Sequence, residues 1–167
     1  MQALRRGRIL LIGSLAVTLS ACGGGSTGPL TPAGPQLPQI AVGVSPAPIN
    51  ATFVRTTGNI STFRMAADVR LVESAGIAAR VTQFSATITT RYSAQGVTGT
   101  SAATMTESAL INIAPSGTAT YTHTQEFGVG DDVESVTWRF TVAGVDPQGR
   151  SFTASSPVID VQLAAVR

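Results

Sequence analysis

Apolar and polar residues alternate with a period of two through most of the chain after residue 39. Over residues 62–71 the odd-numbered positions are apolar and the even-numbered ones mostly polar, and residues 136–143 alternate in the same way with the even-numbered positions apolar. Successive side chains of a β-strand point to opposite faces, so this alternation is typical of strands that bury one face. No segment after Leu19 keeps an apolar period of about 3.6 residues over about three turns. The sequence therefore predicts an all-β domain.

Turn-forming residues divide this region into about seven strands. Pro46 and Pro48 end the first, and Pro157 interrupts the last, which suggests a bulge or an edge position there. The Gly- and Ser-rich residues 93–103 are expected to separate two strands. Asp146-Pro147-Gln148-Gly149 has the composition of a type I turn. The expected strands are 40–45, 62–71, 77–92, 110–113, 118–127, 136–145 and 150–161.

The strand expected at 77–92 contains a break in phase. Phe84, Ala86 and Ile88 share one face, whereas Val81 falls on the other. A β-bulge near residues 82–83 would bring Val81 to the buried face, and the alternative is a solvent-facing Val81.

Trp138, the only tryptophan, is expected to point into the core. Val136, Phe140 and Val142 share its face, while Arg139 lies on the other. A register slip of one residue would exchange Trp138 and Arg139, and the pattern opposes such a slip.

Short strands separated by turns, without a helix, are typical of an antiparallel β-sandwich. The hairpin expected over residues 138–161 is similar to the final hairpin of immunoglobulin-like and fibronectin type III-like domains of bacterial surface proteins. The resemblance implies an immunoglobulin-like sandwich of about seven strands. Antibody-type domains pair two cysteines around a tryptophan, whereas this chain has one cysteine, so that subclass is excluded.

The first 22 residues have the composition of an export signal. Arginines precede an apolar run at 9–19, and the small residues Ser20 and Ala21 follow it. Such a run rises only about 16 Å as a helix, against about 30 Å for the hydrocarbon core, which disfavours a permanent transmembrane helix. Leu19-Ser20-Ala21-Cys22 resembles the bacterial lipobox, in which leucine and two small residues precede a cysteine.

The lipobox resemblance implies a lipid-anchored protein of the cell envelope. In that family a diacylglycerol is added to the cysteine, here Cys22, and the signal before it, here residues 1–21, is removed. Gly23 in place of aspartate then implies export to the outer rather than the inner membrane of a two-membrane cell. Residues 22–39 hold five glycines and four prolines without charge and are predicted to be a flexible tether. The sandwich is expected at 40–167.

Charge and composition exclude several classes of function. From Cys22 onward, eight arginines stand against nine acidic residues, a net charge of −1, which gives no electrostatic footprint for nucleic acid. Lysine is absent, which excludes a phosphate-loop lysine, a Schiff-base lysine and a Ser-x-x-Lys site. His123 is the only histidine and Cys22 the only cysteine, so neither a zinc site of such ligands nor an intrachain disulfide can form. No cofactor is predicted.

An acidic cluster near residue 131 is the weak candidate for a metal site. Asp131, Asp132 and Glu134 follow Gly128 and Gly130, with Glu126 on the other side of these glycines, and calcium prefers such oxygen ligands. The Asp-x-Asp-x-Asp-Gly spacing is missing, so a solvated loop is the favoured interpretation.

Catalysis has less support. Paired carboxylates could hydrolyse a glycosidic bond, but only 5% of the residues are aromatic and few could line a sugar cleft. His123 lies on an expected strand and could point to either face of the sheet. A Ser-His-Asp triad would require this histidine, but the Gly-x-Ser-x-Gly motif is absent.

Two functions stay open. The favoured one is a non-enzymatic envelope module that binds a protein or carbohydrate, adheres, or serves as an accessory subunit. The alternative is a small carboxylate-dependent hydrolase, for example one acting on envelope polysaccharide.

We expect the Cys22→Ser variant to lose palmitate labelling and to keep its signal uncleaved, because serine has no thiol to accept the lipid. Metabolic labelling with palmitate and the size of the product on an immunoblot measure both effects. A labelled, membrane-bound serine variant would show that the lipobox interpretation is wrong.

Overall fold

The structure, a computed structural model, describes residues 36–165, so the predicted signal and Cys22 lie outside the described residues. The described part contains nine strands and no helix, and hence no helix that could cross a membrane. The strands are β1 (Ile40–Ser45), β2 (Ile49–Thr57), β3 (Ile60–Glu73), β4 (Ala79–Ala94), β5 (Val97–Ile113), β6 (Thr118–Gly130), β7 (Val133–Val145), β8 (Ser151–Ser155) and β9 (Ile159–Leu163).

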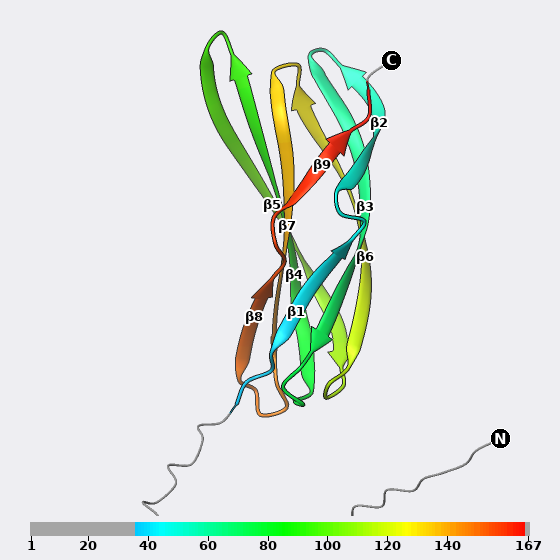
Figure 1. Cartoon of the computed structure of the whole chain (residues 1–167), viewed down its shortest axis with the longest axis vertical. Coiled ribbons are helices and arrows are strands. Elements are labelled where there is room, and N and C mark those ends of the chain that lie inside the picture. The colour runs from blue at the N-terminus through cyan, green and yellow to red at the C-terminus, as the bar shows by residue number, and fades with distance from the viewer. Residues whose placement is uncertain (1–35, 166–167) are drawn as a thin grey trace, which may run out of the picture. The chain divides into compact units, whose positions relative to one another are not determined.

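The strands form two layers (Figure 1). In one layer β3 is central, with β6 on one side and β1 and β2 on the other. In the second layer β4 and β7 are central, β5 lies outside β4, and both β8 and β9 pair with β7. All pairs are antiparallel except β2 with β9, which joins the two layers along one side.

Proline explains why nine strands occupy seven positions. β1 and β2 run in succession along β3, separated by residues 46–48, and β8 and β9 run in succession along β7, separated by 156–158. Pro46, Pro48 and Pro157 lie in these gaps and lack the N–H that a continuous ladder needs. One layer therefore has three strand positions and the other has four. The predicted antiparallel immunoglobulin-like sandwich is confirmed.

Aromatic side chains fill the centre of the core. Trp138, Phe84 and Phe140 are each 0% exposed. The ring centroids of Trp138 and Phe140 lie 4.4 Å apart, and those of Phe84 and Phe140 lie 5.4 Å apart. The expectation that Trp138 points inward is thus confirmed, and the alternation of residues 136–142 identified the buried face correctly.

The phase break at Val81 is a β-bulge. The pairing of β4 with both neighbours shifts register between Val81 and Gln83. Because of this shift Val81 and Phe84 are both fully buried. The predicted bulge is confirmed, and the solvent-facing alternative is wrong.

Two strand predictions were incomplete. The stretch at 93–103 belongs mostly to β4 and β5, which meet at a tight turn where Gln95 and Gly96 both have positive φ, as a type I′ turn requires. β2 was not expected at all. β2 and β5 contain few buried apolar residues. The alternation that marks a half-buried strand is therefore missing from these two segments.

The turns gather at the two ends of the domain. The β2–β3, β4–β5 and β6–β7 hairpins lie at one end, and the start of β1 lies at the other with the turns that follow β3, β5 and β7 (Figure 1). At this second end Arg150 Nη2 donates to the carbonyl oxygen of Gln36 at 2.7 Å. The Asp146 carboxylate in turn holds Arg150 Nε at 2.6 Å. The chain therefore enters the domain opposite the three hairpins.

We expect Trp138→Ala to lower the free energy of unfolding by about 3–5 kcal/mol, because it leaves a cavity in the centre of a core that has no disulfide. Trp138→Phe should cost far less, since an aromatic ring remains. Urea denaturation followed by circular dichroism compares the two variants with the wild type. A loss below about 1 kcal/mol for Trp138→Ala would contradict its central place in the core.

Candidate binding groove

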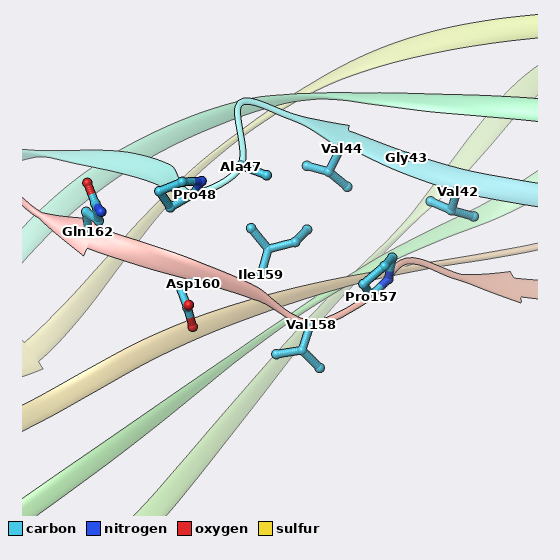
Figure 2. A pocket seen from close by; sticks show the side chains of 10 residues that line it. All are labelled: Val42, Gly43, Val44, Ala47, Pro48, Pro157, Val158, Ile159, Asp160 and Gln162. Atoms are coloured by element: carbon cyan, nitrogen blue, oxygen red, sulfur yellow. The ribbon is translucent and has the colours of Figure 1, made fainter.

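A groove opens at the edge of the sandwich where β1 gives way to β2 and β8 gives way to β9. Figure 2 shows it between β1 and the junction of β8 with β9. Its volume of about 450 Å³ falls in the range of about 300–1,000 Å³ that is typical of ligand pockets. The groove is lined by Val42, Gly43, Val44, Ala47, Pro48, Pro157, Val158, Ile159, Asp160 and Gln162.

The local sequence keeps the groove open. Within the described residues β1 pairs only with β3, and β8 pairs only with β7, so each strand has one edge without a strand partner. Ser156 takes up the last ladder position beside Phe140, to whose carbonyl oxygen it donates at 2.9 Å, and Pro157 follows without an N–H. The edges of the two layers therefore do not join at this point.

The lining is apolar with a polar rim. Val42 and Ile159 form its floor at 7% exposure each, and Val158, which is 60% exposed, borders the groove on the β9 side. Asp160 and Gln162 are exposed at the rim. Asp160 is the one ionisable side chain of the lining, so the groove has no second group for paired acid and base chemistry. Its composition suits binding.

The acidic candidates are not assembled as a ligand set. Glu126 pairs with Arg64 (Oε1 to Nε, 3.0 Å) and Glu134 with Arg91 (Oε2 to Nε, 3.0 Å). Asp131 and Asp132 are exposed in the turn between β6 and β7. Over residues 36–165 no three His, Cys, Asp or Glu side chains gather as metal ligands. Two of the four carboxylates thus take part in ion pairs, and the other two are exposed in the turn.

His123 is a core residue held by its neighbours. It is 5% exposed, with Nδ1 lying 3.2 Å from Glu107 Oε1 and Nε2 lying 3.4 Å from Gln125 Oε1. Tyr121 donates its hydroxyl to the same Glu107 oxygen at 2.6 Å. That hydrogen bond, with burial and the carboxylate charge, raises the pKa of Tyr121 to about 12. Both ring nitrogens have partners in the protein, so the arrangement does not suit a catalytic base.

The most connected carboxylate was not identified from the sequence. Glu73 is 1% exposed. Burial raises its pKa, but hydrogen bonds from backbone N–H groups outweigh burial and hold the pKa below its usual value. These donors link the turn after β3, the turn after β5 and the start of the domain, so Glu73 has a structural role. They are Ala75 (2.7 Å), Gly76 (2.9 Å), Ser116 (2.9 Å), Ile77 (3.1 Å) and Gln39 (3.3 Å).

Comparisons with known proteins do not identify a family. No family model and no curated protein matches the chain. A structural-genomics target, SoR45, is 16% identical with a TM-score of 0.48, over 72% of this chain and 84% of that one. The putative ApaA protein of Bordetella pertussis is 15% identical with a TM-score of 0.47, over 78% and 98%. The sporulation control protein Spo0M of Bacillus subtilis is 12% identical with a TM-score of 0.35, over 76% and 50%. Likenesses this distant carry no inference about function.

We expect Glu73→Gln to lower the free energy of unfolding by about 2 kcal/mol at neutral pH, because the amide loses the charge-assisted hydrogen bonds and places its NH₂ group among N–H donors. The pKa of Glu73 in the folded protein lies below its usual value of 4.5. The wild-type advantage should therefore be complete above about pH 5 and disappear as the pH falls through the lowered pKa.

Urea denaturation at about pH 7 and about pH 2 measures this difference. Glu126→Gln serves as the control, because its exposed ion pair with Arg64 should contribute less than about 1 kcal/mol. A Glu73→Gln difference that stays the same at both pH values would contradict the structural role.

Proposed function

We propose that this chain is a lipid-anchored, non-enzymatic binding protein of the cell envelope that takes an extended segment of a partner protein into the groove between β1 and the β8–β9 junction. The observation that carries the proposal is the combination of an apolar floor with strand edges that have no strand partner among the described residues. Edges of this kind present backbone N–H and C=O groups to an added strand.

The sequence supports the membrane anchor. The lipobox at residues 19–22 supplies the lipidation residue Cys22, and the uncharged tether gives the domain reach from the lipid surface. Gly23 favours the outer membrane over the inner one. The protein then lies outside the cytoplasm, held to the membrane through its N-terminal lipid.

The lining favours a peptide over a carbohydrate. None of the lining residues is aromatic, so a sugar ring would find no face on which to stack. An extended peptide instead places alternate side chains on the floor formed by Val42 and Ile159, while its backbone pairs with β1 along residues 42–44, where that strand lines the groove. Asp160 at the rim favours a basic residue beside the segment.

The hydrolase alternative finds little support in this geometry. Glycoside hydrolysis needs two carboxylates facing one cleft. Glu126 and Glu134 are paired with arginines, Glu73 accepts backbone hydrogen bonds, and Asp160 is alone in the groove.

Photo-cross-linking in cells tests the groove. A benzophenone amino acid replaces Val158 in the full chain, and Ile60, which is 42% exposed outside the groove, is the control position. We expect a cross-linked product at position 158 only, because the occupant lies against that side chain. Mass spectrometry should place the cross-link in an extended segment with alternating apolar residues.

A second variant separates binding from non-specific contact. Ala47→Trp adds a large side chain at an exposed lining position, so it should fill the groove and abolish the cross-link while leaving the core unchanged. A cross-link that survives Ala47→Trp, one that forms equally at position 60, or one that maps to a glycan would show that the proposed peptide site is wrong.

A further inference from the structure

β5, the outermost strand of the layer that contains β4 and β7, has a long backbone edge without a strand partner. β5 runs over 17 residues, Val97–Ile113, and within the described residues it pairs only with β4. Figure 1 shows the β4–β5 hairpin standing apart from the other hairpins at its end of the domain. One row of backbone N–H and C=O groups on β5 is therefore available for pairing.

This edge carries none of the usual protection. Natural edge strands are blocked by charged side chains, proline or bulges. Residues 97–106 contain neither charge nor proline. Their pairing with β4 is regular, and the one register shift between the two strands falls beyond Ser108. Val97 is 67% exposed and Met105 is 45% exposed on the face that turns inward elsewhere along the strand. Residues 97–106 are thus an unprotected, partly apolar edge.

We propose that two copies of this chain pair through residues 98–106 of β5, edge to edge and antiparallel, about a two-fold axis at Ala102. A second copy is the favoured occupant because residues 97–106 carry no charge, so they offer a charged partner nothing to recognise but meet the same uncharged residues of a second copy without repulsion. The pairing closes after two copies, which removes the exposed edge.

The hydroxyl pattern sets the axis at Ala102. Thr98, Thr100, Thr104 and Thr106 lie symmetrically about this residue, so Thr100 faces Thr104 of the second copy and Thr98 faces Thr106. The same pairing of hydroxyls already joins β5 to β4, where Thr104 lies 2.9 Å from Thr87 and Thr106 lies 2.9 Å from Ser85. A hydroxyl donates one hydrogen bond and accepts two, so these rows can continue across the axis.

On the face of β5 opposite the threonines, the side chains of the two copies are complementary in size. In this register Met105 faces Gly99 of the second copy. The Tyr92 ring lies against Gly99 so closely that a Cβ added there would clash with the ring. The methionine thioether would thus meet a position without a side chain beside an aromatic ring, which is a favourable contact for sulfur.

Cysteine cross-linking in cells tests the pairing. The full chain carries Ala102→Cys, and Thr124→Cys on β6 is the matched control, since it is exposed on the edge strand of the other layer. After mild oxidation we expect about tenfold more disulfide dimer from Ala102→Cys than from Thr124→Cys or the wild type, because facing residues of paired strands lie within disulfide range. Equal dimer from the control, or none from Ala102→Cys, overturns the proposal.

A charge exchange tests the two-fold axis. Copies with two different tags are produced together, and the co-captured copy is measured. Ala102→Lys in both copies should reduce co-capture about tenfold, because like charges then face each other. Ala102→Lys in one copy with Ala102→Glu in the other should restore it, and Thr124→Lys should have no effect. The proposal is overturned if two Ala102→Lys copies are co-captured as well as two wild-type copies. It is also overturned if combining Ala102→Lys with Ala102→Glu does not restore co-capture.

Discussion

The packing of His123 from β6 against Phe84, Trp138 and Phe140 from β4 and β7 joins the two layers in a domain that has no cysteine beyond residue 22. Without a disulfide, burial of the inner faces has to offset the loss of conformational entropy on folding. The bulge in β4 contributes directly, because it brings both Val81 and Phe84 to the buried face. His123 extends the aromatic cluster from β6, with its ring centroid 5.5 Å from that of Trp138.

Proline determines where this core is left open. A strand that lacks an N–H at one position cannot continue its ladder there, so β1 stops before residues 46–48 and β8 stops before Pro157. Because the two interruptions face each other across the edge of the sandwich, the space between them becomes the groove. The same residues that limit the strands thus supply its apolar lining.

Local pattern predicted the parts of the fold in which one face of a strand is buried. Residues 62–71 and 136–143, the bulge near Val81 and the break at Pro157 could all be predicted, since each depends on neighbours in the sequence. β2 and residues 97–103 could not be, because their exposed side chains carry no alternation in polarity. The groove and the Glu73 hydrogen bonds have no local signal either: Glu73 binds the N–H of Ser116, 43 residues away.

Two of the open edges of the sandwich, those of β1 and β5, differ in the partner that they suit. The edge of β1 borders an apolar floor and a single carboxylate, so it offers both backbone pairing and side-chain pockets to a segment of different sequence. The edge of β5 has no such floor next to residues 97–106, and its flanking side chains are mostly small or hydroxylated. Backbone pairing without side-chain pockets selects little between sequences, and the symmetry of an identical strand then supplies the complementarity. Since the two edges lie on opposite sides of β7 and β4, occupation of one leaves the other accessible.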